Sequence, residues 1–172
     1  HQVEDVATDY LGVEVTNFSV RYLCDTLLSQ RTRKGLLTRL TMQGPEVQAI
    51  RGMVDGLRVI AENFFLNLHP FLSKDPAIRI RRKGIVPDIL SDPLMELRDE
   101  LLELTAESQE EELEIKAFAA RAHSHASAVR VNLDQSAEGF VYWAEREKER
   151  YRLVASPIDV AETLRENLFG KT

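Results

Sequence analysis

The longest regular hydrophobic pattern in the chain lies over residues 46–72, where apolar side chains recur at alternating steps of three and four positions. Side chains at this spacing share one face of an α-helix. The pattern therefore predicts a helix of about 26 residues, roughly 39 Å long at 1.5 Å per residue. Gly52 and Gly56 lie one turn apart within it. Because each costs about 1 kcal/mol relative to alanine, we interpret them as points of close helix packing or of a slight bend.

Shorter patterns predict further elements before this helix. A short helix over residues 2–10 ends at Gly12, because glycine adopts left-handed dihedrals readily. Alternating valines over residues 13–15 predict a short extended segment. A helix over residues 19–30 follows, with Ser19 as its N-cap. Three leucines then continue with helical spacing before a Gly-Pro break: Leu36, Leu37 and Leu40.

Residues 74–93 interrupt the helical pattern. This stretch contains residues that are incompatible with a continuous helix, namely Pro76, Gly84, Pro87 and Pro93. Within it, residues 78–81 can form a short exposed strand. We expect an excursion from the helical body whose basic side chains face solvent.

Helical spacing returns after this interruption, first with leucines at 94, 97, 101 and 104. Ser108 and Glu111 then have the spacing of a capping box, in which each side chain satisfies the free backbone amide of the other residue. A new helix from Gln109 is therefore expected rather than one unbroken rod. It ends before Gly139, and its predicted apolar face consists of Leu113, Ile115, Phe118, Ala122, Val129 and Leu133.

The last third of the chain changes to a period of two. Residues 140–144 and 151–154 are rich in aromatic and β-branched side chains, which predicts a β-hairpin whose charged loop is 145–150. Trp143 is expected in the core. Pro157 ends the ladder, and Asp159 caps a last helix over 160–168. Taken together, the patterns predict a mainly α fold, with a bundle of long helices and a small β-hairpin.

Composition narrows the class of protein. The chain has 172 residues, is 44% hydrophobic and contains one cysteine, Cys24. This residue continues an apolar helical pattern and is predicted to be a small core residue. A single thiol forms no internal disulfide and cannot by itself hold zinc or an iron–sulfur cluster. With no signal segment and no apolar run of about 18 residues, we expect a cytoplasmic protein without membrane contact.

Charge is distributed unevenly. The net charge of −6 argues against general nucleic-acid binding by the whole chain, yet nine carboxylates and one arginine lie between Glu96 and Glu114. Two basic groups lie elsewhere, at residues 31–39 and 79–83. The first either contacts DNA or only caps a helix C-terminus. The second either contacts DNA or is a solvated loop. The acidic stretch is best interpreted as a solvated helix face.

Catalytic and metal-binding patterns are weak. Of the histidines at 69, 123 and 125, the last two are two positions apart, which places them on different faces of a helix. A metal site is therefore not predicted. The sequence also lacks the Gly-x-x-x-x-Gly-Lys-Thr phosphate loop. We do not expect this chain alone to hydrolyse ATP.

Three motifs at the two ends carry a family resemblance. They are Val-Glu-Asp-Val-Ala at 3–7, Val-Tyr-Trp at 141–143 with a nearby glutamate, and Ser-Pro-Ile-Asp-Val at 156–160. Their order and spacing resemble the stretch between two ATPase motifs of DinG/XPD-type superfamily 2 DNA helicases. In that family an Asp-Glu-Ala-His box precedes this stretch and a Ser-Ala-Thr-type motif follows it. His1 would be the last residue of this box and thus part of the catalytic site, unless it is the remnant of a purification tag.

The resemblance implies three segments. Residues 1–18 and 137–172 would be flanks of the first motor domain, including short helices, and 19–136 would be the Arch, a helical insertion. The parent enzyme would use ATP and magnesium, and many relatives also carry an iron–sulfur cluster. The Arch helps the rest of the motor to enclose single-stranded DNA as it moves 5′ to 3′. The implied DNA-binding residues are Arg79, Arg81, Arg82, Lys83, Arg31, Arg33 and Lys34.

A rival hypothesis keeps the helices without the motor. In it the chain is a stand-alone helical interaction module without catalytic activity. The heptad-patterned helix over 46–72 would then bind another protein or a second copy of itself.

Overall fold

The structure is a computed structural model that describes residues 12–158. His1, the helices predicted over 2–10 and 160–168, and the predicted cap Asp159 lie outside the described residues. Of the described residues, 55% are helical and 16% are in strands. The chain is therefore a mixed α/β protein rather than the mainly helical bundle that we predicted. The difference arises because the predicted hairpin is the centre of a four-stranded antiparallel sheet.

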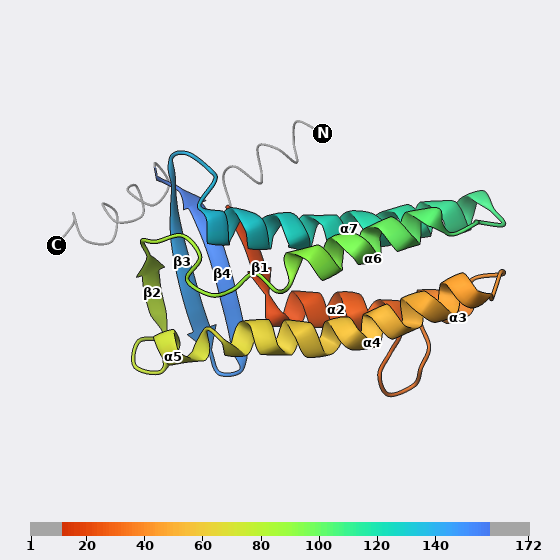
Figure 1. Cartoon of the computed structure of the whole chain (residues 1–172), viewed down its shortest axis with the longest axis horizontal. Coiled ribbons are helices and arrows are strands. Elements are labelled where there is room, and N and C mark those ends of the chain that lie inside the picture. The colour runs from red at the N-terminus through yellow and green to blue at the C-terminus, as the bar shows by residue number, and fades with distance from the viewer. Residues whose placement is uncertain (1–11, 159–172) are drawn as a thin grey trace, which may run out of the picture.

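The sheet lies at one end of the molecule, and the long helices extend away from it (Figure 1). Its strands follow the order β1-β4-β3-β2. One strand comes from the predicted segment 1–18, one from 19–136 and two from 137–172. The bounds are Val13–Thr16 for β1, Ala77–Ile80 for β2, Phe140–Glu147 for β3 and Arg150–Pro157 for β4.

The hairpin between β3 and β4 is tighter than predicted. Only residues 148 and 149 connect the two strands, where 145–150 was expected to be a loop. The extra charged residues lie in the ladder, and cross-strand ion pairs accommodate them. Arg152 pairs with Glu145 on the neighbouring strand and with Glu14 on β1.

Four long helices pack in two pairs. α2 (Asn17–Leu27) lies against α4 (Pro45–Leu66), and α6 (Ser91–Glu103) lies against α7 (Gln109–Asp134). The pairs meet where α4 contacts α6 and α2 contacts α7. Residues 12–158 also contain two single-turn helices, α3 (Leu36–Arg39) and α5 (His69–Leu72). None of the helices in the described part of the chain is long and apolar enough to cross a bilayer.

The helix predicted over 46–72 is divided in the structure. α4 ends at Leu66, and α5 begins at His69. Pro70 explains the break, because it has no N–H to donate to the carbonyl of Leu66 four residues earlier. Close helix packing, one of the two interpretations given for Gly52 and Gly56, was also wrong. Both are exposed, and among the described residues no neighbouring atom lies within 4 Å of a Cβ built at either position.

Two helix starts differ from prediction. Thr16, not Ser19, is the N-cap of α2. The two residues form a capping box, since the Ser19 amide donates to Thr16 Oγ1 at 2.9 Å and the Thr16 amide donates to Ser19 Oγ at 3.1 Å. α6 begins at Ser91, so Pro93 lies inside it. Its place in the first turn is tolerated because an N–H there would have no helical partner.

The start of α7 is confirmed in part. Ser108 is its N-cap and accepts a hydrogen bond from the Glu111 amide at 3.1 Å. The Glu111 carboxylate, however, accepts bonds from the amides of Glu107 and Thr41 rather than from the Ser108 amide. The return half of the predicted box is thus replaced by a contact with the loop after α3.

The hydrophobic face predicted for 46–72 forms part of the protein core. Its buried members are Val47, Ile50, Val54, Leu57, Ala61, Phe64 and Leu68. Cys24 is also buried in the core, as predicted. The face predicted for α7 is confirmed except at Leu113, which is 62% exposed.

The aromatic pair of β3 faces the opposite way from the prediction. Tyr142 is 5% exposed and belongs to the core. Trp143 is half-buried on the other face of the sheet, where its register neighbours are Arg79 and Val154. Expecting Trp143 in the core was therefore wrong.

Candidate functional site

The second basic group lies at the edge of the sheet. Arg79 belongs to the edge strand β2, in which Ile80 faces the core, so Arg79 points to the outer face. Arg81, Arg82 and Lys83 follow in a loop that we call the basic loop (residues 81–84). The three side chains are exposed, and no ion pair connects any of them or Arg79 with another residue among 12–158.

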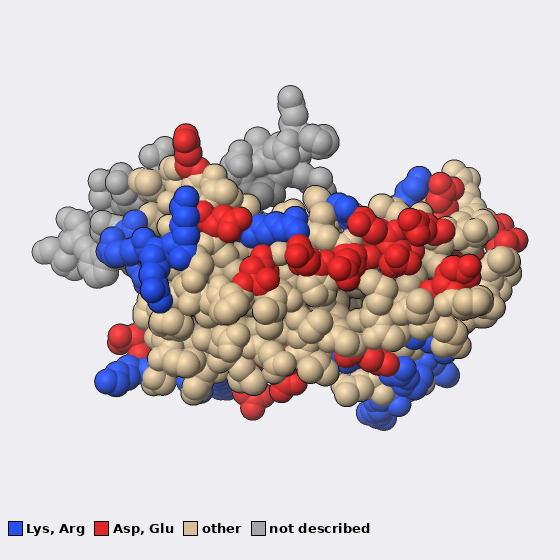
Figure 2. Space-filling view, in the orientation of Figure 1, with Lys and Arg blue, Asp and Glu red and all other residues tan. Residues whose placement is uncertain are grey.

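The surface shows the same separation of charge. In Figure 2, Lys and Arg side chains gather at the end of the molecule where β2 lies, and Asp and Glu side chains form a stripe along α6 and α7. The run of carboxylates from 96 to 114 belongs to these two helices and the turn that connects them. A polyanion is favoured at the basic end and repelled along the stripe.

The backbone of the basic loop is held by the end of α7. Gln135, the residue after this helix, adopts a left-handed conformation with φ 51°. Its side-chain Nε2 donates to the carbonyl oxygens of Ile80 at 3.0 Å and Arg82 at 3.3 Å. The Gly84 amide donates to the Leu133 carbonyl at 2.8 Å. These bonds use backbone atoms of the loop and leave its cationic side chains available.

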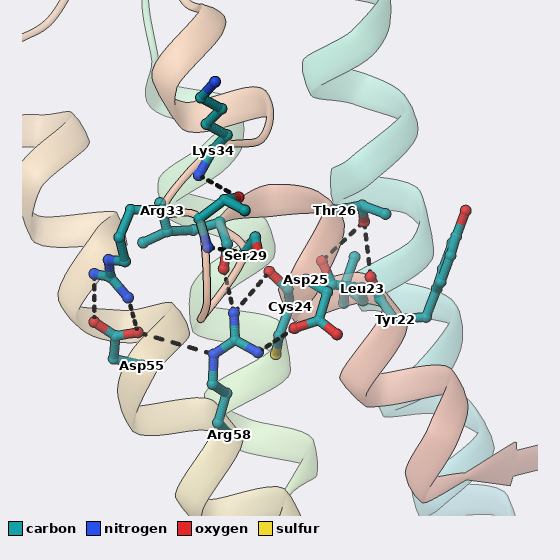
Figure 3. Close-up of polar contacts among 12 residues, drawn as sticks. Tyr22, Leu23, Cys24, Asp25, Thr26, Ser29, Arg33, Lys34, Asp55 and Arg58 are labelled. Atoms are coloured by element: carbon teal, nitrogen blue, oxygen red, sulfur yellow. Dashed lines mark hydrogen bonds and ion pairs between the residues drawn. The ribbon is translucent and has the colours of Figure 1, made fainter.

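Arg31, Arg33 and Lys34 of the first basic group lie in the loop between α2 and α3, away from the sheet (Figure 1). Arg39, the last residue of α3, pairs with Glu114 on α7. Arg33 is already engaged as well. Its two terminal nitrogens donate to the two carboxylate oxygens of Asp55 on α4, each at 3.0 Å (Figure 3). These bonds hold the pKa of the Asp55 carboxyl below its usual value. Arg31 and Lys34 are exposed.

Arg58 on α4 is the residue that caps the end of α2. Its side chain is only 12% exposed and pairs with Asp25. It also donates to the carbonyls of Cys24 and Leu28 (Figure 3). Burial raises the pKa of the Cys24 thiol to about 11, although the nearby Arg58 charge opposes the shift. The thiol is therefore protonated at neutral pH.

The structure thus does not bring the two predicted DNA-binding groups together. One lies at the sheet edge, and the other lies in the loop between α2 and α3, where Arg33 pairs with Asp55 on α4. One interpretation of the first group was that it caps a helix C-terminus. The arginine that caps the end of α2 is instead Arg58, which lies on α4 and outside that group.

A groove that sequence reasoning missed lies between α2, α4 and the β3–β4 turn, with a volume of about 760 Å³. Its lining combines apolar side chains such as Phe65 with the cations Arg21 and Lys148. Arg33, Arg58 and Arg146 line it as well, and the carboxylates in its lining are Asp55, Glu62 and Glu149, so cations exceed carboxylates by five to three. Val59 and Leu66 on α4, seven positions apart, also line the groove and are exposed. In the sequence they differ from the core residues only in being apolar residues outside the predicted stripe.

The histidines occupy separate surroundings. Nδ1 of His69 lies 2.7 Å from the hydroxyl oxygen of Tyr151. Nδ1 of His123 lies 2.9 Å from a terminal nitrogen of Arg98. Burial, followed by the charge of Arg121, lowers the pKa of His125. Over the described range, no three His, Cys, Asp or Glu residues gather in a way that could hold a metal ion.

Comparisons of the chain with protein-family models, with curated proteins and with solved structures found no match. What the chain does is therefore inferred from its own residues and from the motif resemblance at its two ends.

Proposed function

We propose that this chain is part of a DinG/XPD-type ATP-dependent DNA helicase, in which it helps to enclose and guide single-stranded DNA over the motor during 5′ to 3′ movement. The remainder of the parent enzyme supplies the phosphate loop and binds ATP and magnesium. One observation carries the proposed DNA contact. Arg81, Arg82 and Lys83 are exposed on one anchored loop and make no ion pair with any other residue among 12–158.

Physical chemistry supports this assignment of the basic loop. Cations that neutralise phosphates release condensed counterions, which is the main source of sequence-independent affinity for nucleic acid. Single-strand binding also uses aromatic rings on which bases stack. Trp143 lies beside Arg79 in the sheet register, on the same outer face. The strand that leads into the basic loop therefore places one cation, Arg79, beside an aromatic side chain.

The rival interaction module receives less support. It relies on the heptad-patterned face of residues 46–72 as a docking surface. That face is buried against the other helices of the same chain, so it is not available to a partner while the chain is folded.

Fluorescence anisotropy with labelled oligothymidine, measured between about 50 and 200 mM salt, tests the proposal. Arg81→Ala combined with Arg82→Ala should weaken binding about tenfold and reduce the salt slope by about 1.4, because each lost phosphate contact on a single strand contributes about 0.7. The matched control is Arg31→Ala with Lys34→Ala, which changes the net charge equally.

The control pair should change the affinity by less than about twofold, since its effect is limited to long-range electrostatics. Equal losses from both variants would show that net charge, rather than the basic loop, determines binding. No salt-sensitive binding by the wild-type chain would remove the proposed role in guiding DNA.

A further inference from the structure

The turn that follows α7 is fixed to the sheet. The buried hydroxyl of Tyr142 on β3 accepts a hydrogen bond from the Ala137 amide at 3.0 Å and donates one to the Ala137 carbonyl at 2.8 Å. Ala137 is two residues from Gln135. The core thereby holds the backbone from which the Gln135 side chain reaches the basic loop.

Gln135 and the end of α7 hold the basic loop at three backbone points. The side-chain Nε2 of Gln135 donates to the carbonyls of Ile80 and Arg82, and the backbone amide of Gly84 donates to the carbonyl of Leu133. Ile80 lies just before the loop, and Gly84 is its last residue. The three cationic residues therefore lie between fixed points, although their like charges repel one another.

We infer that Gln135 is a positioning residue that orders the basic loop for contact with single-stranded DNA, an inference that rests on the proposed function. A loop ordered before binding loses less conformational entropy when its side chains meet phosphates. Gln135 makes no contact with DNA in this arrangement. It acts only through the backbone carbonyls that it holds.

The test uses Gln135→Asn and Gln135→Gly in the full chain. Asparagine and glycine both tolerate the left-handed conformation of this residue, so neither should disturb the end of α7. Asparagine is one methylene shorter and cannot span both carbonyls, and glycine has no side chain. Agreement between the two variants separates loss of the amide from the extra backbone freedom of glycine.

A matched control lies in the loop after α3. Nε2 of Gln43 donates to the carbonyls of Leu37 at 2.8 Å and Leu40 at 2.9 Å. Gln43→Ala therefore removes the same kind of two-carbonyl anchor from a part of the molecule outside the proposed DNA site.

Two readouts are measured for every variant. Amide hydrogen exchange over residues 81–84, with tryptic cleavage after Arg81, Arg82 and Lys83, reports local opening of the loop. Oligothymidine anisotropy reports binding. Both Gln135 variants should increase loop opening and weaken binding by about fivefold, the factor that corresponds to one net hydrogen bond. The salt slope should stay unchanged, because all cations remain.

The outcomes separate the inference from the proposed function. Normal binding by Gln135→Asn, weaker binding without faster loop exchange, an effect of the glycine variant alone, or an equal effect of Gln43→Ala would each overturn the inference. If Arg81→Ala with Arg82→Ala leaves binding unchanged, the proposed function fails and the role of Gln135 in DNA binding fails with it.

Discussion

Replacing Arg58 with methionine should destabilise the fold substantially, because Arg58 connects two helices through backbone atoms. Its guanidinium extends from α4 to the carbonyls of Cys24 and Leu28 at the end of α2, and it also pairs with Asp25. Methionine keeps the apolar stem and a good helix propensity. The substitution therefore removes mainly the polar contacts.

The expected loss is about 2–3 kcal/mol. The Cys24 carbonyl still accepts a bond from the Leu28 amide at 2.8 Å, so it keeps a partner. The partly buried Leu28 carbonyl loses a charged donor, which costs about 1–3 kcal/mol. The pair with Asp25, a residue whose side chain is 46% exposed, adds at most about 1 kcal/mol. For a chain of this size the loss corresponds to a decrease in Tm of about 4–12 °C.

Urea unfolding measures the effect, with a lower midpoint and an unchanged m-value expected for Arg58→Met. Arg33→Met is the matched control. It breaks the pair with Asp55, in which both side chains are nearly half exposed, so its effect should be smaller and should disappear at high salt. A loss for Arg58→Met that is no larger than the control, or that also vanishes in about 1 M salt, would refute the role given to the Leu28 carbonyl.

Two further predictions concern Cys24 and the glycines of α4. At neutral pH the buried Cys24 thiol should react with alkylating reagents only when the chain unfolds. The protonated thiol contributes its full share to the free energy of unfolding below pH 9.0, and this share is lost as the pH rises through the folded-state pKa of about 11, because the thiol of the unfolded chain ionises first. Urea unfolding of Cys24→Ala should therefore lack this part of the decline in stability at alkaline pH. Gly52→Ala and Gly56→Ala should each raise the free energy of unfolding by about 0.5–1 kcal/mol, since both positions face open space, and a lower urea midpoint would instead indicate close packing.

The helical part of the fold could be predicted because its signals are local. The apolar stripe of α4 and the N-cap of α7 each depend on residues within a few turns of one another. The end of α4 and the start of α2 were harder to predict. Pro70 falls inside the predicted helix, because the apolar stripe continues past it to Phe71. Thr16 and Ser19 are both good caps, and only the end of β1 at Thr16 decides between them.

The sheet could be predicted only in part, because strand pairing is not local. The β3–β4 hairpin was visible from its aromatic alternation, whereas β1 and β2, with four residues each, were predicted only as short extended segments without partners. Their pairing with strands far away in the sequence gives no local signal. The same limit explains the error at Trp143. Alternation separates the two faces of β3 but does not say which face turns inward; the ring of Tyr142 faces the core, and its hydroxyl bonds to the backbone of Ala137.

The two basic groups show why a candidate site cannot be judged from charge alone. In sequence they are nearly alike, Arg-Thr-Arg-Lys at 31–34 and Arg-Ile-Arg-Arg-Lys at 79–83. The first follows a helix end that faces α4, where Asp55 lies within reach of Arg33. The second follows an edge strand, whose alternation sends Ile80 inward and Arg79 outward. The two groups therefore differ at Arg33, which the fold places beside a carboxylate, whereas Arg31 and Lys34 are exposed like the basic loop. The role of Gln135 depends on the fold in the same way, because it follows from the two carbonyls that this side chain meets.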